Sequence, residues 1–198
     1  RELLLTVLPP RLVDSDGNVT GSGETTDEAT VVAVWLELQD DDPDSDTVLE
    51  LLSTASTVAE SIAADLGMER IRRAADHSLF LSGIGSESDG VEDAIRFTRS
   101  LVDEVTQLAI TEQIRLDVHA GLSTGRVATG MLERGNLSFA AWGSPVRRAL
   151  AIGALNTDDT VVLDRTTAER AQAMGFATEP AGERVSLDGE PIQVYVLD

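Results

Sequence analysis

Two adjacent arginines stand just inside a predicted helix start. The stretch "AWGSPVRRALA" covers residues 141–151 and includes Arg147 and Arg148. Ser144 can cap a first turn and Pro145 fits its first position, so we expect a helix to begin here. Guanidinium groups bind phosphates or carboxylates through paired hydrogen bonds. The two arginines therefore either hold an anion or stand where another functional group has been replaced.

An acidic run follows the most apolar stretch of the chain. Five aspartates fall within residues 40–46, "DDDPDSD". An EF-hand calcium loop needs alternating acids, a glycine in mid-loop and a terminal glutamate, and none of these is in register here. We interpret the run as a solvated acidic turn, with a calcium loop as the alternative.

Other residue types with catalytic potential lack partners in the sequence. Ser144 has no histidine near it, and its helix-capping role accounts for it. His77 and His119 have no second histidine or cysteine at metal-ligand spacing. We therefore assign neither a nucleophile nor a histidine metal site.

Composition restricts the partners of the chain. The 198 residues carry a net charge of −20, and all 15 basic residues are arginine. Such a surface repels nucleic acid and anionic membranes, so we expect neither as a partner. The absence of cysteine suits a cytoplasmic location, and no apolar run reaches the roughly 20 residues of a spanning helix. We expect one domain over residues 1–198, excised from a larger protein, with residues 1–28 forming an initial segment and a mobile loop.

Periodicity and turn signals predict an α+β fold. The order strand, helix, strand, strand, helix, strand is that of a ferredoxin-like βαββαβ sheet with its helices on one face. A C-terminal extension of helix, strand, helix and hairpin follows. The expected elements are a strand at 29–38, a helix from Asp46, a hairpin at 69–85, a helix at 89–109 capped by Asp89 with Glu92, strand, glycine turn and strand at 114–132, a helix after Trp142, a strand at 160–164, a helix from Thr166 and a closing hairpin.

Several segments together resemble the class III nucleotidyl cyclase catalytic domain, the fold of adenylyl and guanylyl cyclases. "LLLTVLPPRLV" resembles the start of that domain, and "VVAVWLEL" resembles its first strand. "MERIRRAADHSLFLSGIG" is similar to its metal-binding hairpin, and "HAGLSTGRVATGM" to its glycine-containing turn. "FAAWGSPVRRALA" is similar to Y-x-x-W-G-x-x-V-N-x-A-x-R. Their order and spacing imply the cyclase fold over nearly the whole chain.

The resemblance implies a two-metal site at Glu37 and Asp76. Cyclisation of a nucleoside triphosphate needs two cations, held by oxygen ligands. Asp76 matches the family residue, whereas Glu37 replaces an aspartate, and its extra methylene displaces the carboxylate where Mg²⁺ demands near-ideal octahedral geometry. Weak binding of Mg²⁺ or Mn²⁺ at these two residues is expected. The plainer alternatives are a hairpin-turn aspartate and a strand-end glutamate.

The positions that should bind the nucleotide depart from the family pattern. The acidic residues 40–46 stand where the triphosphate would lie, in place of the family's glycine, phenylalanine and threonine. Purine recognition falls on Arg72 and Ala140, which cannot make the expected base contacts. The asparagine and arginine of the catalytic helix correspond to Arg147 and Ala151, so the catalytic arginine is missing.

The sequence therefore predicts a degenerate cyclase homology domain with a regulatory or dimerising role in intracellular signalling. The alternative is a weak or atypical adenylate or guanylate cyclase. A refinement of that alternative is an enzyme active only beside a partner chain that supplies the missing groups. The expected partner is a second copy or another cyclase-like domain, since the family's active sites lie between two chains. In that dimer Arg147 and Arg148 would pair with acids across the interface.

Overall fold

The computed structural model describes residues 12, 16, 23–39, 45–73, 77–134, 136–154, 161–186 and 189–198. Eight strands and four helices make up this described part. In chain order they are β1 (Gly23–Leu38), α2 (Ser45–Asp65), β2 (Glu69–Arg73), β3 (His77–Ser82), α3 (Val91–Glu112), β4 (Leu116–Arg134), β5 (Asn136–Trp142), α4 (Ser144–Ala154), β6 (Val161–Asp164), α5 (Arg165–Ala173), β7 (Thr178–Val185) and β8 (Pro191–Leu197).

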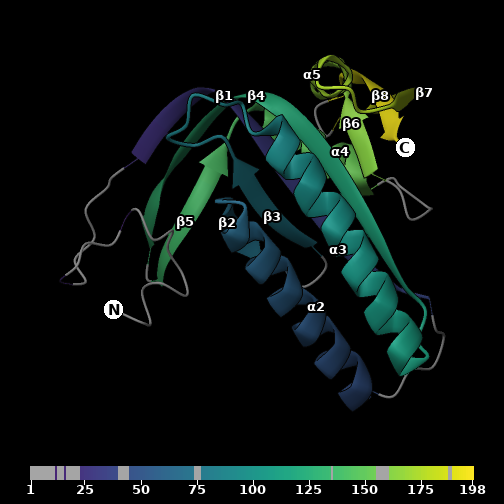
Figure 1. Cartoon of the computed structure of the whole chain (residues 1–198). Helices are drawn as coiled ribbons and strands as arrows, with labels where there is room; N and C mark the ends of the chain where they lie inside the picture. Colours follow the sequence, from purple (N-terminus) through teal and green to yellow (C-terminus); the bar gives the residue numbers. More distant parts are fainter. Residues whose placement is uncertain are drawn as a thin grey trace.

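The strands form one sheet in the order β2-β3-β1-β4-β6-β8-β7, with β5 paired to β4 outside this path. The first four strands and the helices α2 and α3 have the predicted βαββαβ arrangement, so the ferredoxin-like α+β fold is confirmed. β4 and β6 run parallel, and the other paired strands run antiparallel. The closing β7 and β8 hairpin stands at the far end of the sheet from β5 (Figure 1).

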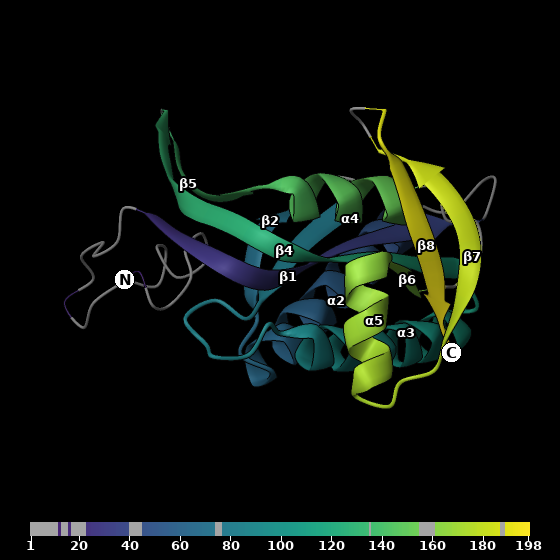
Figure 2. The same cartoon turned by 90° about the horizontal axis from the view of Figure 1, so that it is seen from above.

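Helices cover both faces of the sheet. α2 and α3 lie side by side on one face, as expected, whereas α4 packs on the opposite face (Figure 2). The alternation of β1 explains this division, because Val32 and Val34 join the core under α2 and α3 while Val31 and Ala33 join the core under α4. A strand that is buried on both faces has a continuous apolar sequence, as residues 31–36 have.

β4 departs from the prediction of two strands joined by a glycine turn. It runs without a break from Leu116 to Arg134, and Gly121 and Gly125 lie inside it. Its length follows from its pairing, because β1 runs beside it from Leu38 back to Gly23. β1 thus begins within residues 1–28, for which the sequence predicts a mobile loop, and it carries an irregularity between Thr26 and Ala29.

Three helix starts differ from the predicted ones. α3 begins after Gly90, which has a left-handed φ of 76°, and Asp89 accepts a hydrogen bond from the Val91 amide instead of capping a longer helix. Glu92, the expected partner in a capping box, pairs with Arg96 at 2.6 Å. α5 begins at Arg165 rather than Thr166, because Asp164 is its cap, and α2 begins at Ser45, one residue before the predicted Asp46. Cap signals of this kind place a helix end only to within a residue or two.

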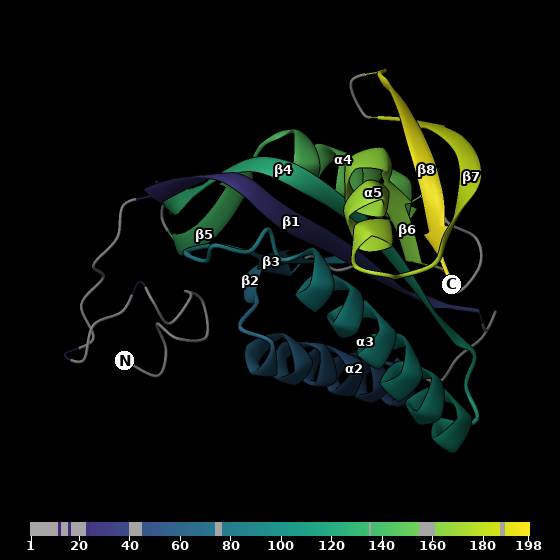
Figure 3. The same cartoon turned by 45° about the horizontal axis from the view of Figure 1, so that its top comes forward.

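An ion cluster joins α5 to β1 and to the residue before α3. Figure 3 shows how these three elements lie in the fold. Arg170 of α5 donates to Asp89, before α3, at 2.5 Å. It also donates two hydrogen bonds to Glu28 of β1, at 2.5 and 3.0 Å. These bonds lower the pKa of the Glu28 carboxyl and raise the pKa of Arg170. The cluster therefore joins three segments that are distant in the sequence.

Replacing Arg170 with methionine should destabilise the domain in a pH-dependent way. Loss of the partly buried contact with Asp89 should lower the free energy of unfolding by about 1–2 kcal/mol. Because the folded pKa of Glu28 lies below its ordinary value of 4.5, the Glu28 contribution exists above that value and disappears as the pH falls through the lowered one. Urea unfolding at pH 7 and at pH 3 should show a smaller difference between variant and unmodified domain at pH 3. The exposed Arg165 of the same helix, changed to methionine, is the control, and a pH-independent difference for Arg170 would contradict the role of Glu28.

Candidate functional site

Glu37 lies one residue before the end of β1, on the face where α4 packs. The Cα of Glu37 pairs with that of Asp117, and the Cα of Trp35 pairs with that of His119. Glu37 Oε2 lies 3.2 Å from Nε2 of His119, whose side chain is 3% exposed against 61% for Glu37. The contact is a close polar approach rather than an aligned hydrogen bond. The expected metal ligand therefore has a protein partner.

Trp35 links this region to β3 and to α4. Its ring stacks on His77, with centroids 5.5 Å apart and planes 30° apart. It also lies against Gly153 of α4, where an added Cβ would be 2.2 Å from the indole Cζ3. Next to this contact, α4 approaches β4 so closely that a Cβ on Gly121 would lie 2.2 Å from the carbonyl oxygen of Ala149. Glycine at both positions thus allows helix and sheet to touch.

Only one of the two carboxylates of the implied metal centre, that of Glu37, belongs to the described residues. Asp76 lies outside the described residues, as do residues 40–44 of the acidic run. In the described part of the chain, no group of three or more histidine, aspartate or glutamate side chains could hold a metal ion. Mg²⁺ or Mn²⁺ at Glu37 and Asp76 therefore stays a prediction.

The two positions implied in base recognition lie on neighbouring parts of the sheet. Arg72 is on β2, where its Cα pairs with that of Leu79, and its side chain is not among those described. Ala140 is half-buried on β5, paired with Gly130 of β4. A methyl group at residue 140 offers no hydrogen bond to a purine edge.

The helix that the resemblance implies to be catalytic is α4, which begins at Ser144 as predicted. Arg147 is exposed on it, whereas Ala151 is only 4% exposed. Ala151 packs in an apolar cluster with Ile152 and three residues of the C-terminal strands: Val162, Ile192 and Val194. The position of the expected arginine has thus become part of the core.

Arg148 has an acidic partner within its own chain. Its Nη1 lies 3.8 Å from Oδ2 of Asp164, which is nearly buried. Asp164 also accepts hydrogen bonds from the Ser123 hydroxyl at 2.6 Å and from the Thr167 hydroxyl at 2.7 Å. The pairing of both arginines across an interface stays a prediction, and Arg148 also has a buried carboxylate beside it at the cap of α5.

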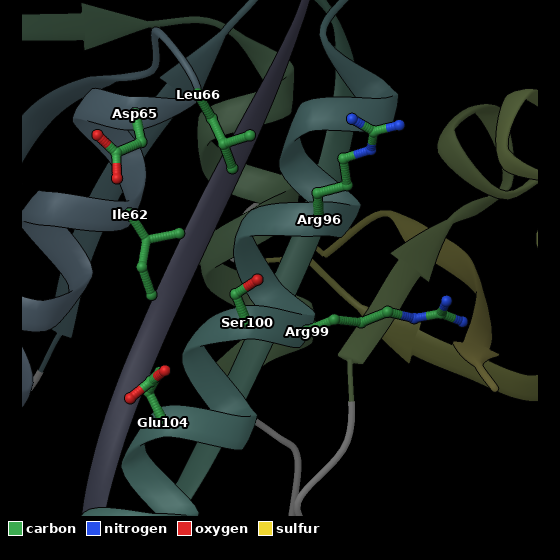
Figure 4. Close-up of a pocket in the computed structure, with 7 residues that line it drawn as sticks. All are labelled: Ile62, Asp65, Leu66, Arg96, Arg99, Ser100 and Glu104. Carbon is green, nitrogen blue, oxygen red and sulfur yellow. The ribbon is translucent and has the colours of Figure 1, made fainter.

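A surface pocket of about 500 Å³ lies elsewhere, between α2 and α3 (Figure 4). Arg99, on its rim, points away from α2 and donates to the backbone carbonyl of Asp198. The pocket is on the helix layer, on the other side of the sheet from Glu37 and α4. It is lined by Ile62, Asp65, Leu66, Arg96, Arg99, Ser100 and Glu104.

Comparison with known proteins identifies the family. The family model of the adenylate and guanylate cyclase catalytic domain matches residues 36–198. The chain belongs to this family. None of the helices in the described residues of this cyclase domain is both long and apolar enough to cross a membrane. A search of curated proteins finds no significant match.

Solved cyclase structures share the fold of this cyclase domain at low sequence identity. The adenylyl cyclase CyaB from P. aeruginosa is 14% identical, with a TM-score of 0.80 over 88% of this chain and 96% of that one. The guanylate cyclase domain of RhGC from Catenaria anguillulae, in complex with GTP, is 16% identical, with a TM-score of 0.78 over 88% and 98%. A dimeric guanylyl cyclase domain of the RhoGC fusion protein from Blastocladiella emersonii is 17% identical, with a TM-score of 0.74 over 88% and 97%. These similarities establish the fold.

Sequence reasoning did not find the partner of Glu37. His119 was set aside because no other ligand stands near it in the sequence. Its approach to Glu37 depends on the register of β1 against β4, which joins residues 82 positions apart. Strands were predicted at both segments, but the register that aligns Trp35 with His119 was not.

Proposed function

We propose that this cyclase domain is catalytically inactive and acts as a regulatory, dimerising module in signalling of the cyclic-nucleotide type. The observation that carries the proposal is the burial of Ala151 among apolar side chains of α4, β6 and β8. An arginine that stabilises charge on a transferring phosphate is worth a factor of about a thousand or more in rate. A methyl group enclosed in a core cannot supply that charge.

Other features support the same proposal. The carboxylate of Glu37 contacts His119, Ala140 offers no hydrogen bond to a base, and residues 40–46 carry five aspartates where a triphosphate would lie. Like charges at close range oppose triphosphate binding by about 1 kcal/mol or more per pair near a surface. A domain with these changes retains the cyclase fold but lacks the residues that catalysis needs. Its role is then to bind other chains through its surface.

The proposed partner is a second cyclase-like domain, either another copy of this chain or a related chain. Both dimeric and monomeric guanylyl cyclase domains are among the structures that share the fold. The charge of −20 on each chain makes two copies repel each other. A related chain that carries less negative charge would associate more readily, and it could contribute the missing base-recognition residues, asparagine and arginine.

Self-association should therefore strengthen as salt is added. At about 0.1 M salt the screening length falls to about 10 Å, so repulsion between the two chains weakens. Sedimentation velocity at increasing NaCl and fixed protein concentration should show a shift from monomer to dimer. Changing the exposed Arg147 to glutamate adds negative charge and should raise the salt needed, while Arg165→Glu on α5 is the matched control. A monomer at every salt concentration would remove homodimerisation from the proposal.

A further inference from the structure

The Glu37 side chain lies toward His119 rather than toward Asp117, the residue directly opposite it. Glu37 stands directly opposite Asp117 in the pairing of β1 with β4, and His119 is its diagonal neighbour. Like charges placed directly opposite on a sheet repel each other, whereas an imidazole is a polar partner for a carboxylate. The Glu37 carboxylate follows this preference and approaches Nε2 of His119 to 3.2 Å.

The imidazole is enclosed within the fold. His119 is 3% exposed and lies beside Trp35, which is itself held by its stack on His77 and by its contact with Gly153. Drawing Glu37 away would remove the electrostatic attraction between its carboxylate and this ring, which is stronger in such a poorly solvated place than in water. A cation that drew Glu37 outward would have to compensate for that loss.

We propose that His119 holds the Glu37 carboxylate against β4 and so withholds it from a divalent cation. This inference deepens the proposed loss of activity, on which it rests for its biological meaning. It identifies a residue whose contact keeps the Glu37 carboxylate from binding a metal ion. His119 is a positioning residue in this scheme.

Mn²⁺ binding measures whether the carboxylate is withheld. Glu37→Asp shortens the side chain by one methylene, so the carboxylate no longer reaches His119, and the change lies at an exposed position that should not disturb folding. His119→Leu removes the polar partner and leaves Glu37 intact. Each variant should bind Mn²⁺ about tenfold more tightly than the unmodified domain, as measured by calorimetry and by the electron paramagnetic resonance signal of free Mn²⁺.

The double variant Glu37→Asp with His119→Leu separates this role from a purely geometric effect at residue 37. Both substitutions release the same carboxylate, so the double variant should bind Mn²⁺ about tenfold more tightly than the unmodified domain rather than a hundredfold. Unchanged binding in His119→Leu, or two gains that multiply, would overturn the proposal. Weaker binding in His119→Leu would also overturn it, because His119 would then be a ligand itself.

Folding of the variants can be checked independently of Mn²⁺. If His119→Leu fails to fold, Glu37→Gln in the unmodified background keeps the test open. Loss of the carboxylate should shift the imidazole ¹⁵N resonances of His119, with His77 as the internal reference. Unshifted His119 resonances would overturn the contact itself. None of these measurements uses cyclase activity, so a domain that turned out to be active would refute the proposed function without deciding this inference.

Discussion

Gly121→Ala and Gly153→Ala should each lower the free energy of unfolding of this domain by about 3 kcal/mol or more. An alanine in a helix is normally about 1 kcal/mol more favourable than glycine, so at Gly153 the expected sign is reversed by packing alone. An added Cβ would lie 2.2 Å from the Ala149 carbonyl oxygen at residue 121, and 2.2 Å from the Trp35 ring at residue 153. Real Cβ atoms do not approach other atoms so closely, and α4 must move away from β4.

The two variants should differ in whether they can be rescued. The obstacle at Gly153 is a side chain, so Trp35→Leu should recover part of the loss and give a favourable coupling energy in a double-mutant cycle. The nearest obstacle at Gly121 is backbone, so the same second change should recover little. Urea unfolding of the single and double variants measures both, with Ala154→Gly at the exposed end of α4 as the control. Equal rescue at both positions would contradict the contacts described here.

The order and type of most elements could be predicted because those signals are local. Helical spacing in α2 and α3 and alternation in β2 and β3 act over a few positions, and these elements have the predicted types. β4 was divided because glycine is usually a sign of a turn. Gly121 is instead required by the approach of α4, a contact between segments that are nearly 30 residues apart. Distant packing of this kind leaves no local signal.

The positions of the candidate site could be identified in the sequence, but the contacts of their side chains could not be predicted from it. Glu37, Ala140, Arg147 and Ala151 were identified as departures from a family pattern, which needs only alignment of motifs. What their side chains contact depends on register and burial. The carboxylate beside Arg148, for example, belongs to Asp164, a helix cap 16 residues later in the chain.

The purified domain should form no detectable cyclic nucleotide from ATP or GTP, even with excess Mn²⁺. Each lost electrostatic contact to the transition state is worth about 3 kcal/mol, so losing the arginine at residue 151 and weakening the metal site should together remove several orders of magnitude of rate. Calorimetry should show no saturation with either nucleotide in the millimolar range, with or without Mn²⁺. Product that disappears on Asp76→Ala would show that the domain is an enzyme, and the proposed function would be wrong.

Restoring the family residues on α4 should not create activity. Arg147→Asn changes an exposed position and should fold normally, but Ala151→Arg forces a guanidinium into a cluster of isoleucine and valine side chains. Burying an unpaired charge costs several kcal/mol, so that variant should be less stable as well as inactive. Ala154→Arg, on the exposed end of the same helix, is the matched control and should keep its stability. If Ala151→Arg folded with unchanged stability and the double variant produced cyclic nucleotide, residue 151 would face the substrate rather than the core, because only an arginine that reaches a phosphate can restore the rate.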